Sequence, residues 1–467
     1  MNLSSRNKEL AKNTALFGIS SFASKVLVFL MVPLYTSVFT TEEYGISSLI
    51  NITTALLMPL LTMCISDAVL RFCLDNDSNI KEVISYGVKL TLLGTIVAAM
   101  VAYPLNLVLK LGIYAVFIPI QFATNSFYNL LQKMGRGVNK IKECAVAGVM
   151  QTFIVVGLNL LFLLVFELGI LGYILSYIIA QLATAIYLAV KCNLKSYIQK
   201  VNLRSNKKYL QYSVPLVPNN LSWWLIDSAS SYIIKIFVGT AAVGIYSAAM
   251  RVPTIVTVIS GIFIEAWLLS VIKVYDDADG KHYIAVGYRM YKSTMVFITL
   301  VLITLAQPLA RILLRGDFYE GWQYIPIMLC MALLGGLSGF MGTVFSAEKK
   351  TKLYFITALW GGLLATGLSI AYAGRFGLYA VTIACTLGNL LTWMWREVAA
   401  NKYVRFDVSY SRNAIDIICL ATMSVLAMKE LYSYEIIVFA IFGLNNFKDF
   451  KVTVCLLYTS DAADDLI

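Results

Sequence analysis

Long apolar segments alternate with short polar segments along almost the whole chain. A membrane-spanning helix needs about 20 mainly apolar residues, because each residue rises 1.5 Å and the hydrocarbon layer is about 30 Å thick. Fourteen segments reach or approach that length, and the last of them is the shortest and weakest. The pattern predicts an all-α, polytopic membrane protein with helices near residues 13–38, 44–66, 83–109, 112–132, 143–166, 168–190, 212–237, 241–270, 291–314, 323–345, 354–374, 377–398, 412–430 and 433–447.

Basic residues fall mainly between alternate pairs of these segments. With the N-terminus placed inside, the cytoplasmic segments hold 28 of the 37 Lys and Arg residues. The positive-inside rule therefore predicts a multi-pass protein of the cytoplasmic membrane with both termini in the cytoplasm. This topology explains the net charge of +11, and no nucleic-acid-binding motif accompanies that charge. A composition of 59% apolar and 13% charged residues agrees with a membrane protein.

Six basic residues without an acid, from Lys191 to Lys208, divide the chain into two halves that share short motifs. Tyr44-Gly45-Ile46-Ser47 resembles Val243-Gly244-Ile245-Tyr246, Lys140-Ile141-Lys142 resembles Lys350-Thr351-Lys352, and Leu168-Gly169-Ile170 resembles Phe376-Gly377-Leu378, at offsets of 199, 210 and 208 residues. Similar offsets in unchanged order predict a six-helix unit used twice in the same direction. We therefore expect an N-terminal six-helix bundle at 1–190, a basic cytoplasmic linker at 191–211, a second six-helix bundle at 212–400, an additional helix pair at 401–450 and a tail at 451–467.

The N-terminal segment, the C-terminal tail and the cysteines each support a further prediction. The first apolar segment is full length, so we expect a retained span and not a cleaved signal peptide. After Leu457 the chain becomes polar and acidic and resembles translated adaptor sequence, so we expect that the native C-terminus is missing. The eight cysteines are scattered singly, which favours free thiols over disulfides or a zinc site.

Ionisable residues inside the predicted spans are candidates for function because they are costly in hydrocarbon. Lys25 lies about 16 Å from either end of its helix, too deep for its stem to reach the surface. Arg251 is similarly deep, with Pro253 just beyond it. Asp227 is either a counter-ion to one of these cations or a site of proton or sodium coupling. Glu265, near the cytoplasmic end, is either a coupling residue or a solvated acid.

Polar side chains also line two predicted helices. Gln121, Asn125, Tyr128 and Gln132 follow one another at helical spacing and form a narrow stripe. Amides facing lipid would lack partners, so the stripe either bonds neighbouring helices or forms a cavity wall that contacts sugar. A second group, Asn220, Trp223 and Trp224 with Asp227, repeats this pattern, and an indole there could stack on a sugar ring or simply lie near the membrane surface.

The sequence contains few of the residues and motifs that are typical of enzymes. A single histidine, His282, excludes Ser-His-Asp and Cys-His arrangements and histidine-based metal sites. No Walker A sequence, G-x-G-x-x-G or Asp-rich nucleotide-sugar motif is present. We therefore expect a protein that is not an enzyme, holds no cofactor or metal, and takes its energy from an ion gradient, the membrane potential or downstream consumption of its product.

Several short motifs carry a family resemblance over roughly residues 5–450. They are Thr41-Glu42-Glu43-Tyr44-Gly45, Ala68-Val69-Leu70-Arg71-Phe72, Pro215-Leu216-Val217-Pro218 followed by Trp223-Trp224, and Val243-Gly244-Ile245-Tyr246-Ser247-Ala248-Ala249. Together they resemble the polysaccharide-biosynthesis flippases of the multidrug, oligosaccharidyl-lipid and polysaccharide exporter superfamily. One departure is Ala229-Ser230-Ser231-Tyr232, where many relatives have Ser-Asp-Arg-Tyr or Ser-Asp-Arg-Phe, so no role is carried onto Ser230 or Ser231.

The resemblance implies two six-helix bundles around a central cavity, two extra helices, and export of undecaprenyl-pyrophosphate-linked glycan by alternating access. In this interpretation Lys25 and Arg251 compensate the pyrophosphate, and polysaccharide-assembly proteins are candidate partners. Two alternative functions remain: an ion-coupled drug or metabolite exporter of the same superfamily, and a membrane glycosyltransferase or polymerase. The deep cations and the extra helix pair argue against the first, and the short outer loops argue against the second. Neither the glycan, the coupling ion nor the oligomeric state follows from the sequence.

Overall fold

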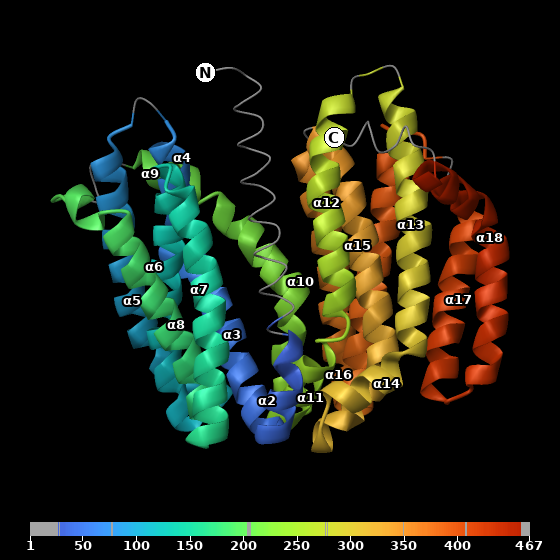
Figure 1. The fold of residues 1–467 in the computed structure, drawn as a ribbon, viewed down its shortest axis with the longest axis horizontal. Coiled ribbons are helices and arrows are strands. Elements are labelled where there is room, and N and C mark those ends of the chain that lie inside the picture. The colour runs from blue at the N-terminus through green and yellow to red at the C-terminus, as the bar shows by residue number, and fades with distance from the viewer. Residues whose placement is uncertain are drawn as a thin grey trace. The chain divides into compact units, whose positions relative to one another are not determined.

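The computed structural model describes residues 27, 29–75, 78–202, 207–275, 277, 279–348, 350–406 and 409–458, and all regular structure in these ranges is helical (Figure 1). The α-helices are α2 (Val32–Val38), α3 (Thr41–Thr62), α4 (Ile65–Cys73), α5 (Ile80–Leu109), α6 (Phe117–Gly137), α7 (Ile141–Leu160), α8 (Gly169–Lys191), α9 (Lys208–Ser213), α10 (Leu216–Phe237), α11 (Thr240–Ala249), α12 (Thr254–Val274), α13 (Gly280–Thr304), α14 (Ala306–Leu313), α15 (Ile325–Ala347), α16 (Thr351–Ala400), α17 (Tyr410–Met428) and α18 (Tyr432–Tyr458). Short 3-10 helices are η1 (Gly112–Val116), η3 (Leu194–Tyr197) and η4 (Gly316–Tyr324), and η2 (Leu161–Val165) is a π-helical turn.

The predicted all-α membrane architecture is confirmed. Within the described residues, 8 helical segments are long and apolar enough to cross a membrane, or 9 if the bent pair α11 and α12 forms one span. They are Thr41–Thr62, Ile80–Leu109, Ile141–Val165, Gly169–Lys191, Gly280–Thr304, Gly316–Ala347, Lys352–Ala400 and Tyr410–Met428. The number of fourteen spans stays a prediction: α16 contains two expected segments separated at Gly377, and most of the first expected segment lies outside the described residues.

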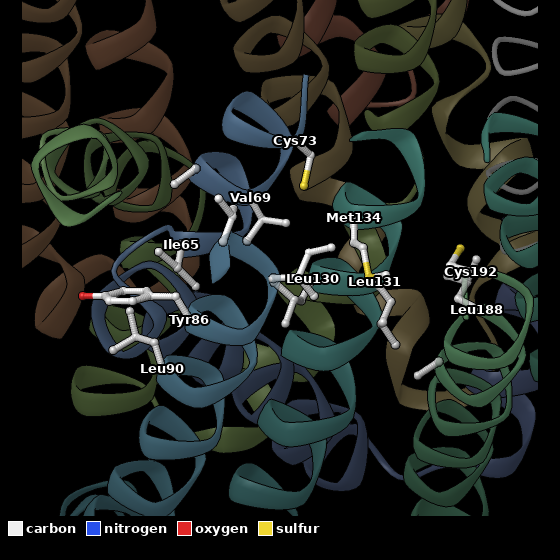
Figure 2. Close-up of a cluster of buried hydrophobic side chains, with 14 of the residues drawn as sticks. Ile65, Val69, Cys73, Tyr86, Leu90, Leu130, Leu131, Met134, Leu188 and Cys192 are labelled. Atoms are coloured by element: carbon white, nitrogen blue, oxygen red, sulfur yellow. The ribbon is translucent and has the colours of Figure 1, made fainter. Parts of the chain in front are cut away.

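The chain forms two compact units, and unit 1 ends at Lys235, so it includes residues that the sequence analysis assigned to the second bundle. Helix α6 is its centre, packed against α3, α4, α5, α7 and α8. A buried cluster at one end of these helices includes Val69, Tyr86, Leu130 and Leu188 (Figure 2). Helices α4 and α5 approach closely at Gly87, where a Cβ would lie 2.7 Å from Val69 Cγ2. Helix α3 begins with a capping box in which Thr40 and Glu43 satisfy each other's backbone N–H groups.

Unit 2 comprises residues 236–467 and is centred on α15. Helix α15 contacts α12, α13, α16 and α17, and 78% of its apolar segment is buried in protein, so its surroundings within the unit are largely helical and not lipid. The additional helix pair α17 and α18 packs on α13 (Figure 1). The pair is therefore an integral part of unit 2.

The two halves repeat the same succession of helices. The starts of α3, α5, α6 and α7 are matched by those of α11, α13, α15 and α16 about 200–210 residues later, as the parallel repeat predicts. Gly169 begins α8 and Gly377 interrupts α16 at a kink, and both have a positive φ, of +54° and +58°. Only glycine takes this conformation without a steric cost from Cβ. The halves therefore share a stereochemical detail as well as an order of helices.

Candidate functional site

Helix α6 carries the predicted polar stripe, and its ends bond neighbouring helices. Gln121 is buried and donates to Asn51 Oδ1 of α3 at 2.5 Å. Gln132 is also buried and donates to the Tyr128 hydroxyl at 2.9 Å and to the Cys144 carbonyl of α7 at 3.1 Å. These contacts match the alternative in which the amides fix helix packing.

A second polar row lies on α6, and the sequence analysis did not identify it. Asn125, Asn129 and Lys133 are spaced four residues apart and are all partly exposed. Asn129 Nδ2 donates to Asn125 Oδ1 at 2.7 Å, and Lys133 Nζ lies 2.8 Å from Asp67 Oδ1 of α4. Of the original stripe, only Asn125 belongs to this row. The four-residue spacing was visible in the sequence, but Lys133 was counted with the cytoplasmic loop.

Helix α10 is held against α3 by polar contacts at successive positions. Trp224 Nε1 donates to the Ile52 carbonyl at 3.1 Å, and the Tyr232 hydroxyl lies 2.7 Å from Thr53 Oγ1. Near the start of α10, Asn220 Nδ2 donates to Cys64 Sγ at 3.2 Å. The predicted candidates Trp223 and Asp227 also lie on α10, but their side chains are outside the described part of the chain.

The remaining predicted residues have different surroundings. Arg251 is half-buried and lies at the break between α11 and α12, where the helix axis bends by 52°. Such a break frees backbone groups that can bind an ion or an anionic ligand. Glu265 is exposed on α12, and Lys25 lies outside the described residues.

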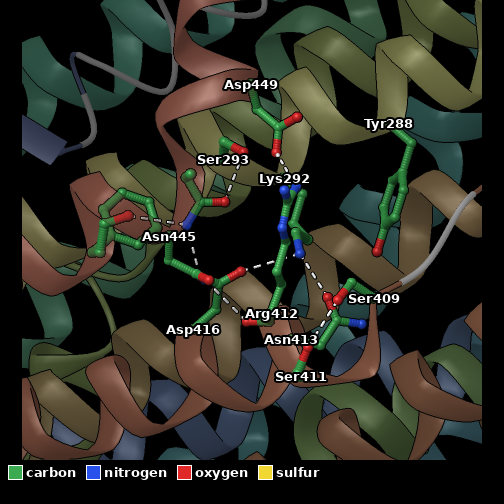
Figure 3. A network of polar contacts seen from close by, with 12 residues as sticks. Tyr288, Lys292, Ser293, Ser409, Ser411, Arg412, Asn413, Asp416, Asn445 and Asp449 are labelled. Carbon is green, nitrogen blue, oxygen red and sulfur yellow. Dashed lines mark hydrogen bonds and ion pairs between the residues drawn. The ribbon is translucent and has the colours of Figure 1, made fainter.

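Unit 2 contains a buried ionic network that the sequence analysis missed (Figure 3). Lys292 of α13 pairs with Asp416 Oδ2 of α17 at 3.1 Å and donates to Asn413 Oδ1 at 2.6 Å. Asn413 also links Lys292 to α16, because its Nδ2 donates to Glu397 Oε2 at 2.6 Å. Glu397 also accepts from the Tyr288 hydroxyl at 2.9 Å. The network thus joins α13, α16 and α17 through residues that are all buried.

The same network reaches α18. Asn445 and Asn446 both donate to Asp416 Oδ1, at 2.9 and 2.8 Å, and Ser293 donates to Asn446 Oδ1 at 3.2 Å (Figure 3). Each oxygen of Asp416 therefore faces a donor or a cation. This satisfaction of a buried carboxylate is what a fixed helix junction requires.

Arg396 is 1% exposed and uses neutral partners. Its guanidinium donates to Thr357 Oγ1, the Ser338 carbonyl and the Tyr354 carbonyl at 2.9, 2.9 and 3.0 Å, and it lies 4.1 Å from the centre of the Tyr354 ring. In the count of basic residues by loop, Arg396 and Lys292 fall among the cytoplasmic charges that predict the topology. In the structure both are buried helix residues that hold unit 2 together.

The described residues offer polar surfaces and cations for binding, and among them no group of three or more His, Cys, Asp or Glu side chains could hold a metal. The seven described cysteines are free thiols, and all are buried. Burial raises the pKa of the Cys73 thiol, beyond the end of the second predicted span, to about 11. Together with the apolar helices, these features belong to a polytopic membrane protein.

The family follows from the sequence over the first 268 residues. The polysaccharide biosynthesis protein family model matches residues 10–268, more than half of the chain, and the chain belongs to this family. With its fold, this makes it a multi-pass membrane flippase or transporter of the multidrug, oligosaccharidyl-lipid and polysaccharide exporter superfamily. No curated protein sequence matches it.

Solved structures show the same fold. The inward closed conformation of the lipid II flippase MurJ is similar with a TM-score of 0.70 at 14% identity, covering 95% of this chain and 99% of that chain. An inward-facing multidrug resistance MATE family transporter gives a TM-score of 0.67 at 13% identity, covering 81% and 95%. A transporter of the superfamily from Pyrococcus furiosus gives 0.59 at 16% identity, covering 84% and 96%.

Proposed function

We propose that this protein is a flippase that moves an undecaprenyl-pyrophosphate-linked oligosaccharide from the inner to the outer leaflet of the cytoplasmic membrane for surface polysaccharide synthesis. Family membership supports the substrate class, and the similar fold of a lipid II flippase supports the reaction. The observation that carries the proposal is the partly exposed row Asn125, Asn129 and Lys133 on the central helix of unit 1. Such a row must face protein or water and not lipid.

The row fits the headgroup of a lipid-linked glycan. A pyrophosphate with several sugars cannot enter hydrocarbon unaided, because each unpaired polar group costs several kcal/mol there. Amides donate to and accept from sugar hydroxyls, so Asn125 and Asn129 suit varied sugars. Lys133 supplies a cation, but its pairing with Asp67 would have to be exchanged for the pyrophosphate. The lipid tail stays in the bilayer throughout.

The candidates from the sequence take distinct roles in this proposal. Lys25 and Arg251 remain the proposed cations for the pyrophosphate, and the helix break at Arg251 supports that role. Trp223 and Asn220 remain proposed sugar contacts. The bonds already made by Gln121, Gln132 and Tyr128 favour a supporting role in positioning α6. Asp227 and Glu265 stay candidates for proton or sodium coupling or for charge compensation.

The orientation belongs to the same proposal. The excess of Lys and Arg in alternate loops favours cytoplasmic termini, so the substrate would load from the side of the 191–211 linker. Polysaccharide-assembly proteins on the outer side would consume the product. Alternating access then needs no catalytic residue in this chain.

The test is glycan export in cells that depend on this protein. We expect Lys25→Ala or Arg251→Ala to abolish surface polysaccharide without lowering the amount of inserted protein, and Lys25→Arg to retain part of it. The matched control is Lys235→Ala, which removes a cation close to a membrane surface. Normal export by both alanine variants would overturn the cationic cavity, and equal loss in the control would point to a general charge effect.

A further inference from the structure

The segment that follows α8 is docked along α5. Ser85 Oγ donates to the Tyr197 carbonyl and accepts from the Gln199 N–H, both at 2.9 Å. One turn further along α5, Lys89 Nζ donates to the Val201 carbonyl at 2.9 Å. These three bonds fix the backbone of residues 197–201 against one helix. This part of the predicted linker is therefore anchored to unit 1.

The next described part of the segment is anchored as well. Tyr209 of α9 is fully buried, with its ring 5.1 Å from that of Phe72 and 5.3 Å from that of Tyr86. The Lys208 ammonium lies over the Phe72 and Tyr209 rings, at 5.9 and 5.2 Å from their centres. We call residues 191–202 and 207–213 the basic strap.

The outward surface of the basic strap is positively charged. Lys191, Lys195, Lys200 and Lys207 are exposed, and none has an ion-pair partner among the described residues. The sequence contains no Asp or Glu from residue 168 to residue 226. Lys200 lies within the anchored residues 197–201, while Lys191 ends α8, Lys195 lies in η3 and Lys207 directly precedes α9. An ordered backbone therefore carries all four charges.

The length of α5 sets the level of the strap in the membrane. Helix α5 has 30 residues, about 45 Å at 1.5 Å each, which exceeds the hydrocarbon thickness of about 30 Å. With Leu109 at one edge of the hydrocarbon, Lys89 lies about 30 Å away at the other edge. Ser85 lies about 6 Å further out, within the headgroup layer. The strap, which both residues anchor, lies at the same level.

We propose that the basic strap binds the phosphate headgroups of anionic phospholipids in the adjacent leaflet. Apolar side chains interspersed with the lysines favour lipid over a soluble acidic partner: Ile198 is 49% exposed and Tyr212 is 41% exposed. At headgroup level such residues enter the acyl boundary while lysines meet phosphates. This site is independent of the proposed glycan transport, because it lies on the outer surface of unit 1's helix ends and not on the α6 row.

The size of the effect follows from the charges. A lysine near an anionic bilayer surface contributes about 1 kcal/mol, or about a five-fold preference, so removing two lysines should reduce the local preference by up to about 25-fold. Salt should weaken the preference, since exposed charges are screened beyond about 10 Å at 0.1 M and about 3 Å at 1 M.

The experiment uses the full chain with Ile198→Cys labelled by a bimane fluorophore, reconstituted in phosphatidylcholine vesicles. Nitroxide-labelled phosphatidylglycerol or nitroxide-labelled phosphatidylcholine is added, and quenching reports which lipid gathers at the strap. The variant Lys195→Gln with Lys200→Gln is compared with Lys350→Gln with Lys352→Gln, which removes two exposed lysines from another basic segment. All four side chains are exposed, so both variants should fold.

We expect the parent protein to enrich phosphatidylglycerol at Ile198, the strap variant to show a preference lower by up to about 25-fold, and the Lys350 and Lys352 variant to retain the parent's preference. Equal quenching by both lipids in the parent would overturn the proposal, as would an equal loss in both variants. Enrichment that persists in 1 M salt would also refute it, because the attraction would not come from the lysines.

Discussion

The ion pair between Lys292 and Asp416 gives the sharpest stability test. Its side chains are 9% and 4% exposed, and Asp416 also accepts two amide bonds from α18. Asp416→Asn keeps the shape and the amide acceptor but removes the charge, leaving the Lys292 ammonium buried without its anion. The variant tests whether the network fixes α17 and α18 to α13.

The expected loss is large because a buried cation would remain unpaired. Breaking a buried ion pair on one side costs about 3–5 kcal/mol. Replacing both partners, in Lys292→Gln with Asp416→Asn, leaves no charge and allows an amide pair, so about half or more of that loss should be recovered. The partly exposed pair Lys140 and Glu143, 3.8 Å apart, should contribute only about 0.2–1 kcal/mol.

The assay is reversible unfolding of the purified protein in mixed micelles titrated with sodium dodecyl sulfate, followed by tryptophan fluorescence. Asp416→Asn, the double variant and Lys140→Gln with Glu143→Gln are measured beside the parent protein. A loss in Asp416→Asn no larger than that of the exposed-pair control would refute the reasoning. A double variant less stable than Asp416→Asn alone would refute it as well.

Three further predictions use other features. Cysteines introduced at residues 195, 281 and 350 should react with an impermeant maleimide only from the cytoplasmic side, and one at Glu42 only from outside; labelling of residue 195 from outside would reverse the orientation. Cys73 should add little to the labelling background at neutral pH, since its pKa is raised by burial to about 11 and it becomes a thiolate only as the pH rises toward that value. Arg396→Lys should lower the midpoint of thermal aggregation in detergent, because lysine cannot direct donors to three separated oxygens, and an unchanged midpoint would refute the role of the guanidinium. For Asp227, glycan-lipid translocation in vesicles with an imposed proton or sodium gradient should distinguish the two roles: rescue of Asp227→Asn by Lys25→Gln or Arg251→Gln would exclude ion coupling.

The sequence predicts features that depend on residues close together in the chain, such as the positions of the helices. The apolar lengths located the helices, but they predicted one continuous span over 241–270, where a bend of 52° close to Pro253 separates α11 from α12. The exposed row on α6 was also readable, since Asn125, Asn129 and Lys133 repeat every four residues. Selecting this row, and not the stripe through Gln121, as the candidate binding surface required knowing which face of α6 packs against α3.

Partners distant in sequence could not be predicted. Lys292 and Asp416 lie on different helices more than a hundred residues apart, and only the packing of α13 against α17 brings them together. Counting the Lys and Arg residues of each predicted loop treats Lys292 as a solvent-exposed charge. The contacts of the basic strap with Ser85 and Lys89 could not be predicted either. The composition of a basic loop does not indicate which helix the loop contacts.

Gly169 and Gly377 show that both halves change helix direction by backbone geometry. A side chain with a Cβ at such a positive φ would cost about 1–2 kcal/mol. That cost would come from the backbone alone, because a Cβ at Gly377 would meet nothing within 4 Å and one at Gly169 would lie 3.7 Å from Glu43 Oε1. The entry into the last helix of each bundle is therefore set by the torsion angles of one residue and not by the packing of its neighbours.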